Sequence, residues 1–403
     1  MKPALNLLVL ASYFKGERFM RQAHARGARV YLLTVEKLLA EPWPRDVLED
    51  VFAQRGGVGS GGPDLRETIA TVSYLARSLR IDRVVPMDDF DVETAEAVRE
   101  HMRLPGMGDS VARHFRDKLA MRVKALELGI PVPSFVPIFS HETVREFIGR
   151  VPPPWMNKPR SQAGATGIAK VESAEELFKL LEAQGDQQSF HLLESYLEGD
   201  VYHVDSLVSD GNVVFSECHR CGTPPFNVAH GGGIYSSVTV ERGSDEERAL
   251  KSLNKKVLTG FGLVRGAAHV EFIRGAKDGE FYFLECAARV GGVHIGDLVE
   301  ASTGLNLWAE WANLEVDDGA RPYELPRVRK DYAGLLMTLA RQERPDTSAF
   351  DDPEVVFRSK EPYHAGLIVQ SSQHARVQAL IDEYVARFRT EFFASLPAAM
   401  YAR

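Results

Sequence analysis

Apolar runs and amphipathic segments alternate at the start of the chain. Short apolar runs occupy residues 5–12 and 28–34, and an amphipathic segment at 16–27, which ends in Gly27, separates them. Short apolar runs bounded by polar residues are typical of buried strands, and glycine commonly ends a helix. The pattern therefore predicts a strand, a helix and a second strand, which together form a βαβ unit.

The same alternation continues to about residue 110. Amphipathic segments at 65–80 and 92–102 predict helices, and residues 82–87 between them predict a strand. Strands that alternate with helices indicate a parallel sheet covered by helices. A glycine-rich run at 55–63 follows an irregular stretch and lacks the GK[ST] ending of a phosphate loop, so we interpret it as a surface loop.

Beyond residue 110 the pattern changes twice. Helices and strands alternate to about residue 192, strands dominate to about 330, and the remainder predicts short strands and one amphipathic helix at 377–392. Turn sequences at 209–212 and 275–280 indicate two β-hairpins. The pattern predicts an α/β protein with α+β lobes in four parts, namely residues 1–110, 111–192, 193–330 and 331–403.

The bulk composition limits the classes of protein. A chain of 403 residues exceeds one ordinary hydrophobic core, which agrees with several domains. The net charge of −8 and the sequence pI near 5.9 argue against a broad nucleic-acid surface. The apolar run at residues 5–12 is too short to span a membrane and lacks a signal-peptide cleavage pattern. We therefore expect a cytoplasmic protein with no nucleic-acid partner and no membrane partner.

The chain has three cysteines, of which Cys218 and Cys221 form a single CxxC motif. No second pair completes a four-cysteine zinc site, although His219 and His230 lie close by in sequence and leave a metal site open. Free thiols in a reducing cytoplasm are the favoured interpretation.

The hairpin around residue 278 is the most informative part of the sequence. Strict alternation of side chains would give each strand one shared face, with Ala267, His269, Glu271 and Ile273 on the first strand and Phe281, Phe283, Glu285, Ala287 and Arg289 on the second. Glu271 and Glu285 lie equally far in sequence from Asp278. Symmetric pairing about the turn therefore places the two glutamates directly opposite each other, with Phe272 opposite Leu284.

Two facing carboxylates require a compensating cation, because like charges directly opposite destabilise a sheet. Carboxylate oxygens are hard ligands that favour Mg²⁺. The alternative is a pair of glutamates at a solvated sheet edge, each paired with a lysine. The apolar residues around Glu271 and Glu285 favour the metal site.

Two further segments are compatible with nucleotide binding. A predicted strand ends at Lys158, and the loop after it contains Gly164 and Gly167, whose backbone could approach phosphate groups closely. An apolar strand ends in Glu194 before a turn at Gly199, where strand-end backbone groups could hydrogen-bond a base. Taken alone, an ordinary hairpin and an ordinary β-arch would give the same patterns.

In this order, the pieces resemble the ATP-grasp superfamily over roughly residues 1–330 of the chain. The segments that carry the resemblance are residues 86–100, 116–133, 157–167, 194–206, 269–273 and 283–307. The resemblance implies a Rossmann-like N-terminal domain, a two-lobed ATP-grasp fold that holds ATP between its sheets, and a small C-terminal α+β segment.

The resemblance also assigns roles to individual residues. The lysines that would contact the nucleotide phosphates are Lys118 and Lys158, and the mobile loop over them contains Gly164, Ala165 and Gly167. The segment that would read adenine comprises Glu194, Ser195, Tyr196 and Leu197. The two magnesium ligands would be Glu271 and Glu285, with Mn²⁺ able to replace Mg²⁺. Arg289, and with it Lys158, would stabilise charge on the phosphoryl group during transfer.

The sequence departs from the family pattern in two places. The family usually has asparagine two residues after the second glutamate, and this chain has Ala287, so one oxygen ligand is missing. His269, expected opposite Ala287, could orient a metal-bound water or simply be a core histidine. The acid that usually contacts the ribose falls on Val201, and we expect Asp200 or His203 to replace it.

The resemblance implies an ATP-dependent ligase. Such an enzyme phosphorylates a small, amino-acid-like carboxylate to an acyl phosphate, couples it to an amine, and releases ADP and phosphate. Residues 220–237 are expected to line the acceptor site, with an ordinary connection as the alternative. A bicarbonate-activating carboxylase and a non-catalytic nucleotide-binding module also remain open, and so does a homodimer.

Overall fold

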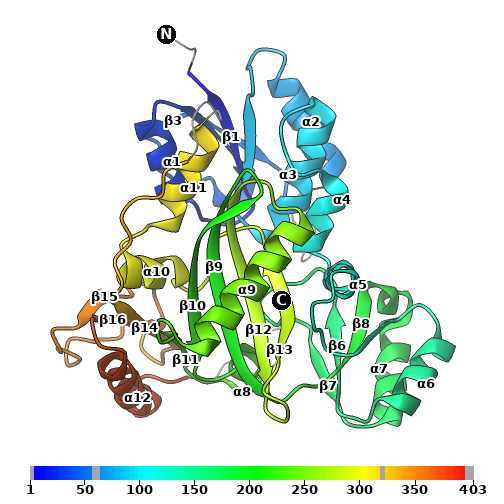
Figure 1. The fold of residues 1–403 in the computed structure, drawn as a ribbon. Helices are drawn as coiled ribbons and strands as arrows, with labels where there is room; N and C mark the ends of the chain where they lie inside the picture. The colour runs from blue at the N-terminus through cyan, green and yellow to red at the C-terminus, as the bar shows by residue number, and fades with distance from the viewer. Residues whose placement is uncertain (1–3, 57–63, 318–322, 395–403) are drawn as a thin grey trace.

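The computed structural model describes residues 4–56, 64–317 and 323–394 (Figure 1). In Figure 1 the N-terminal domain lies above a large central sheet, and a smaller lobe lies beside the lower part of that sheet. None of the helices in the described ranges is long and apolar enough to cross a membrane.

The N-terminal domain is built on a four-stranded parallel sheet, as the alternating pattern predicted. Its strands in spatial order are β3 (Leu48–Gln54), β2 (Arg29–Val35), β1 (Asn6–Ala11) and β4 (Arg83–Pro86). The helices are α1 (Glu17–Ala25), α2 (Leu65–Leu75) and α3 (Asp89–Met102), with a 3₁₀ turn at Glu36–Leu38. Strand β3 was not predicted, because it is a half-exposed edge strand with charged residues. The glycine-rich residues 57–63 lie outside the described residues.

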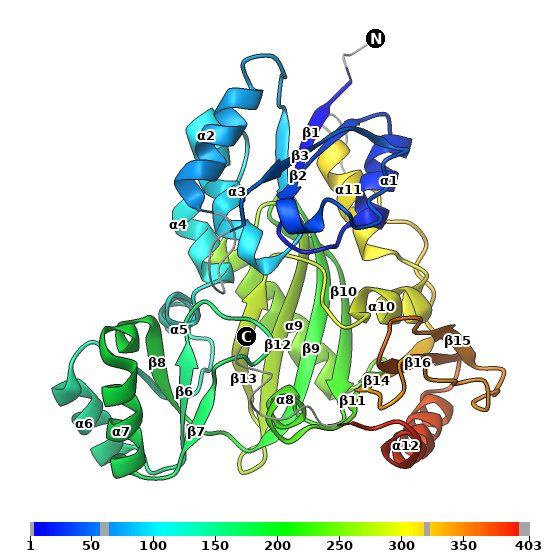
Figure 2. The ribbon, with the colours of Figure 1, turned by 180° about the vertical axis from the view of Figure 1, so that it is seen from behind.

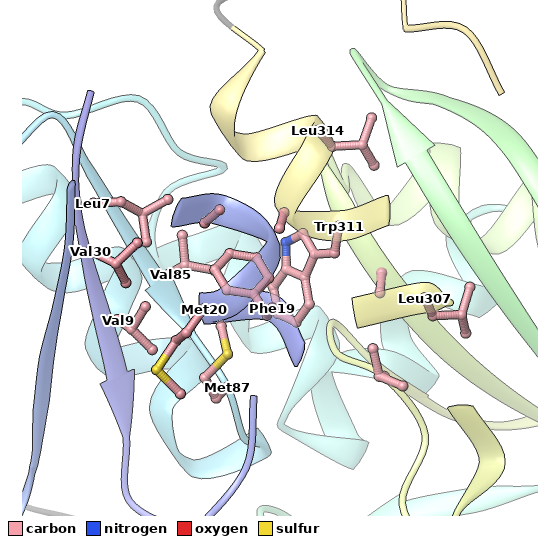
Figure 3. Close-up of a cluster of buried hydrophobic side chains, with 14 of the residues drawn as sticks. Leu7, Val9, Phe19, Met20, Val30, Val85, Met87, Leu307, Trp311 and Leu314 are labelled. Atoms are coloured by element: carbon pink, nitrogen blue, oxygen red, sulfur yellow. The ribbon is translucent and has the colours of Figure 1, made fainter. Parts of the chain in front are cut away.

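A helix from late in the chain completes the core of this domain. Helix α11 (Leu307–Val316) packs against α1, and the rings of Phe19 and Trp311 meet edge to face with centroids 5.3 Å apart (Figure 3). Leu7, Val9 and other strand residues fill the space behind them. Helices α2 and α3 cover the opposite face of the sheet.

The small lobe is a second four-stranded sheet with helices packed on it (Figure 2). Its strands in spatial order are β5 (Phe135–Pro137), β8 (His191–Ser195), β6 (Trp155–Pro159) and β7 (Ala169–Val171). Its helices are α6 (His141–Arg150) and α7 (Ala174–Gln184), followed by a 3₁₀ helix at Gly185–Phe190. The connection from the first domain runs through α4 (Asp109–Ala112), a 3₁₀ turn at Arg113–Phe115, and α5 (Lys118–Glu127).

The large sheet has eight antiparallel strands. In spatial order they are β13 (Phe281–Ala287), β12 (Gly266–Gly275), β9 (Gly199–Ser209), β10 (Asn212–Cys221), β11 (Tyr235–Thr239), β14 (Tyr332–Leu339), β16 (His364–Ser371) and β15 (Val355–Arg358). Its helices are α8 (Pro225–Gly231), α9 (Asp245–Phe261), α10 (Ile295–Thr303) and α12 (His374–Glu391). The strands after residue 331 therefore extend the large sheet.

The register of the β12–β13 hairpin confirms that the two glutamates pair, and it corrects the predicted pairing of the residues beside them. Glu271 pairs directly with Glu285, as the symmetric turn predicted. The register then shifts, and Phe272 pairs with Phe283 instead of Leu284. The cause is a β-bulge, which places one extra residue, Leu284, on the second strand.

The bulge also changes which side chains share a face. Phe281 and Phe283 were predicted on the face of Glu285, but they pack in the core beside Phe272. Since side chains alternate along a strand, the extra residue reverses the alternation at Leu284. Glu285 consequently faces away from that core.

A buried arginine connects the bulge to the small lobe. Arg122 on α5 has no exposed surface, and its Nη1 donates to the backbone oxygen of Leu284 at 2.6 Å. Its Nε lies 2.5 Å from Oε1 of Glu194, at the end of β8. One side chain therefore joins α5, the large sheet and the small lobe.

We predict that Arg122→Met destabilises the protein by about 3–5 kcal/mol, because it removes one partner of a buried ion pair. Urea unfolding followed by circular dichroism measures this loss. The matched control is Arg150→Met at the exposed end of α6, which should remain within about 0.5 kcal/mol of wild type. Equal losses in the two variants would contradict the role of the Arg122 bridge.

Candidate active site

A cleft separates the small lobe from the β12–β13 end of the large sheet. Most of the residues predicted to bind a nucleotide or metal line this cleft, namely Lys118, Lys158, Gly164, Ala165, Glu194, Ser195, Tyr196, Leu197, Glu271 and Glu285. They come from α5, the small-lobe strands, the glycine loop and the β12–β13 hairpin. Residues far apart in the sequence thus meet around one space.

The facing glutamates each contact a basic side chain. Nζ of Lys118 donates to Oε1 of Glu285 at 2.9 Å. Nε2 of His269 lies 3.4 Å from Oε1 of Glu271. Burial raises the pKa of Glu271, but the hydrogen bond and charge of His269 outweigh burial and keep this pKa below its usual value.

Lys118 occupies its position because of the way α5 begins. Asp117 caps the helix by accepting from the backbone nitrogens of Leu119 and Ala120, and carboxylate caps are strongly favoured at a helix start. The Lys118 side chain then reaches into the cleft, where Nζ also donates to the backbone oxygen of Gln162 at 2.6 Å. The lysine therefore links the glycine loop to Glu285.

Lys158 and Glu194 form the second charged pair of the cleft. Nζ of Lys158 lies 2.5 Å from Oε2 of Glu194, whose other oxygen contacts Arg122. Burial raises the pKa of Glu194, but the charges of Arg122 and Lys158 overcome this and lower it to about 2. Glu194 is therefore ionised at neutral pH and holds Lys158 at the cleft wall.

The glycine loop needs unusual backbone conformations. Gly164, Ala165 and Gly167 have positive φ values of 66°, 61° and 72°. Glycine adopts such values without steric cost, whereas alanine rarely does. At Gly167, a Cβ atom would stand 2.9 Å from Cγ of Pro159. Gly164 and Ala165 line the cleft, whereas Gly167 shapes the loop without lining the cleft in the described part of the chain.

Apolar side chains form one end of the cleft. Met156 and Ile168 of the small lobe line this space together with Leu197, Ile273 and Leu284, which pack in one cluster. Apolar walls beside strand-end backbone groups suit a planar base, which is the function predicted for the segment from Glu194 to Leu197. Met156, Ile168 and Leu284 could not be predicted as binding residues from the sequence, because isolated apolar residues give no binding signal.

A second cavity of about 400 Å³ adjoins the cleft at the two glutamates. Gly164, Pro225, Glu271 and Glu285 line both spaces. The remaining wall of the second cavity is largely apolar and includes Tyr235, Val293, Ile295, Met337 and Leu339. Several residues of the 220–237 segment line this cavity, and the acceptor role expected for the segment stays a prediction.

Arg289 lines the second cavity and is held by the N-terminal domain. Its Nε donates to Oδ2 of Asp89 at 2.7 Å, at the start of α3. Burial raises the pKa of Asp89, but the charge of Arg289 keeps it below the usual value. Asp89 lies in the 86–100 segment that carries the family resemblance, but its contact partner is 200 residues away along the chain.

The residues expected to contact a ribose do not line the cleft in the described part of the structure. Asp200 is half-exposed and pairs with Arg220 at 2.8 Å. His203 is buried, and its ring nitrogens contact Asp205 and Ser237, both at 2.7 Å. Strand β9 places His203 in a buried polar cluster, so the structure brings neither side chain to the cleft wall, and the ribose contact stays a prediction.

The CxxC motif does not form a metal centre among the residues that the structure describes. Cys218 and Cys221 are buried, and burial raises the pKa of both thiols. Within the described ranges, the side chains with metal-ligand spacing are His203, Asp205 and His269, without a cysteine. The free-thiol interpretation therefore fits better.

Comparison with known proteins places a known domain in the middle of the chain. Residues 115–293 match the family model for the ATP-grasp domain. The chain as a whole has the fold of the solved structures described below.

Curated relatives match part of the chain. The L-arginine-specific L-amino acid ligase of Bacillus subtilis is 25% identical over 262 residues, which cover 63% of each protein. The carbamoyl phosphate synthase large chain of Thermomicrobium roseum is 25% identical over 292 residues, covering 69% of this chain and 26% of that protein. This chain therefore matches less than two thirds of the length of these relatives.

Solved structures match almost the whole fold. The L-amino acid ligase of Bacillus licheniformis has a TM-score of 0.72 at 18% identity, covering 98% of this chain and 100% of that one. The N5-carboxyaminoimidazole synthetase of Staphylococcus aureus in complex with ADP has a TM-score of 0.71 at 14% identity, covering 96% and 98%.

Proposed function

We propose that this protein is an ATP-dependent carboxylate–amine ligase that works through an acyl phosphate. The observation that carries the proposal is the position of the facing pair, Glu271 and Glu285, at the junction of two cavities. One cavity suits a nucleotide, and the other suits the molecule to which a phosphoryl group is transferred. Lys118 and Lys158 lie on the nucleotide side of this junction.

The residues present fit ATP and Mg²⁺. Two carboxylates on adjacent strands offer the oxygen ligands that Mg²⁺ prefers. Two lysines and the left-handed backbone of the glycine loop suit phosphate groups, and the apolar end of the cleft suits adenine. A bound Mg²⁺ would draw negative charge from the phosphates and make the γ-phosphorus more electrophilic.

The side chains can then direct two successive displacements. Lys118 and Lys158 neutralise the phosphate oxygens while the substrate carboxylate attacks the γ-phosphorus, and the bond to the β–γ bridging oxygen breaks to release ADP. Arg289, fixed by Asp89, offers its guanidinium to the acyl phosphate from the second cavity. An amine then attacks the acyl carbon, phosphate leaves, and the amine loses a proton.

A contact between the two lobes favours a transfer of this kind. Helix α8 of the large lobe contacts the glycine-loop side of the cleft, where Nε2 of His230 lies 2.8 Å from the backbone oxygen of Ile168. Such a contact between the lobes would keep water from the acyl phosphate.

The comparisons favour an amino acid as the carboxylate. Both the curated relative from Bacillus subtilis and the solved structure from Bacillus licheniformis are described as L-amino acid ligases. A bicarbonate-activating reaction is the second candidate, because the fold is also similar to the biotin carboxylase domain of the 2-oxoglutarate carboxylase of Hydrogenobacter thermophilus, which was solved with MgADP and bicarbonate. The volume of the second cavity, about 400 Å³, favours the larger acid.

A substrate screen tests the proposal. Pairs of amino acids and amines, with bicarbonate among the acids, are incubated with MgATP, and released phosphate is measured. We expect phosphate release that requires a carboxylate and an amine together, with ADP as the nucleotide product. AMP as the main product, or phosphate release with bicarbonate alone, would contradict the ligase reaction.

We predict that Glu285→Gln lowers turnover by orders of magnitude, because the variant cannot position Mg²⁺ against the phosphates. The rise in melting temperature that MgADP gives the wild type should also be lost. We do not expect the variant to gain stability from relief of the repulsion between Glu271 and Glu285, because Lys118 is buried and contacts the Glu285 carboxylate. A phosphate assay and thermal melts with and without MgADP provide the measurements.

The matched control is Glu280→Gln, an exposed glutamate in the turn of the same hairpin. It should keep both turnover and the MgADP shift. Normal turnover in Glu285→Gln would exclude this glutamate as a metal ligand.

A further inference from the structure

A line of buried polar residues crosses the large sheet beside the glutamate pair. In the strand register, His269 is paired with Asp205, and Glu271 is paired with His203. Directly paired residues lie on the same face of a sheet. The register therefore places Glu271, His269, Asp205 and His203 together on the face that lines the cleft and the second cavity.

Hydrogen bonds connect these residues into a chain. Nδ1 of His269 lies 2.9 Å from Oδ1 of Asp205, and Nε2 of the same ring lies 3.4 Å from Oε1 of Glu271. A carboxylate can only accept hydrogen bonds. The ring of His269 is therefore placed between two acceptors, with one donor position directed at each.

The other end of this hydrogen-bonded chain of side chains is fixed as well. Oδ2 of Asp205 accepts from Nδ1 of His203 at 2.7 Å, and Nε2 of His203 contacts Oγ of Ser237 at 2.7 Å. The ring of His203 stacks on His219 with centroids 4.9 Å apart and an interplanar angle of 18°. Asp205 itself is fully buried. It therefore has little freedom to change the orientation in which it holds His269.

We propose that Asp205 and His269 are positioning residues that fix the Glu271 carboxylate for binding the divalent cation of the nucleotide. The proposal rests on the proposed function, because Glu271 must be a metal ligand for its orientation to matter. Partners of metal ligands are a common means of fixing ligand geometry, and their loss typically lowers metal affinity or activity by about 10–100-fold.

The same three side chains, His203, Asp205 and His269, also have the spacing of a transition-metal site. The separations of 2.7 and 2.9 Å between their nitrogen and oxygen atoms are those of ordinary hydrogen bonds. The hydrogen-bonded chain is therefore favoured, and metal analysis of the purified protein tests it.

The coupling between Mg²⁺ and ADP measures the positioning role without relying on catalysis. Calorimetry gives the dissociation constant of ADP with and without Mg²⁺, and the ratio of the two constants reports how well the metal is held. In Asp205→Asn, one of the two histidine donors loses its acceptor. We expect the ratio to fall by about tenfold or more, with the affinity for ADP alone unchanged.

Two substitutions of His269 separate positioning from packing. Glutamine places an amide nitrogen near the position of Nε2 and can still donate to Glu271, whereas asparagine places it near Nδ1 and cannot. We therefore expect His269→Gln to retain much of the coupling and His269→Asn to lose it. Asparagine also leaves the larger cavity, so the free energy of unfolding is measured for both variants. A purely structural role would make the loss of coupling follow the loss of stability, whereas the positioning role predicts lost coupling in His269→Asn even under conditions in which the variant is fully folded.

The matched control is Glu217→Gln. Glu217 is a buried acid on β10 directly paired with Asp205, but its carboxylate is held by Arg242 at 2.6 Å. This variant should lose stability and keep the coupling between Mg²⁺ and ADP.

Each outcome of these measurements decides a different point. Wild-type coupling in Asp205→Asn and His269→Asn would overturn the positioning role and leave the proposed function intact. Absence of ADP binding in the wild type would overturn both. A stoichiometric transition metal in the purified protein, lost in Asp205→Asn, would replace the hydrogen-bonded chain with a metal site.

Discussion

The opposed carboxylates of Glu271 and Glu285 constrain the rest of the site. Like charges that face each other across a strand pair repel, and the surrounding hairpin is largely apolar. The structure meets this constraint with Lys118 on one carboxylate and His269 on the other. Each of these bases is held in turn, Lys118 by the glycine loop and His269 by Asp205. Contacts with the two carboxylates of one hairpin therefore connect α5, the glycine loop and the centre of the large sheet.

The β-bulge resolves a conflict between the core and the cleft. Without it, Phe283 and Glu285 would share a face, so that either the ring would enter the cleft or the carboxylate would enter the core. Because of the extra residue, Leu284, the ring of Phe283 packs in the core and the carboxylate of Glu285 faces the cleft. It also leaves a backbone oxygen that accepts from Arg122, which in turn pairs with Glu194. The same irregularity thus helps to fix the small lobe against the large sheet.

The sequence predicts local structure well and long-range pairing poorly. The symmetric position of Glu271 and Glu285 about the turn was sufficient to predict their pairing, because a tight turn determines the register near it. The bulge could not be predicted, since the alternation of the second strand contains no glycine or proline to mark it. Strand β3 was missed because its half-exposed edge position leaves it without an apolar run.

The contacts that hold the site in place also could not be predicted from the sequence. Asp89, Arg122 and Asp205 lie within segments that carried the family resemblance, but nothing in their local sequence indicates their partners. Arg122 contacts a carbonyl 162 positions away, and Asp89 contacts an arginine 200 positions away. Only the folded chain brings these groups together. The sequence also contains no sign that His203 lies within a buried polar cluster with Asp205 and Ser237.

We propose that the facing glutamates mark the place where a phosphoryl group passes from a nucleotide to a carboxylate. The decisive experiment traps the acyl phosphate. The protein is incubated with MgATP, an accepted carboxylic acid and hydroxylamine in place of the amine, and hydroxamate and nucleotide products are quantified together. We expect hydroxamate and ADP in equal amounts, with both absent when the acid is omitted. Hydroxamate accompanied by AMP, or ADP release without hydroxamate, would show that the acid is not activated as an acyl phosphate.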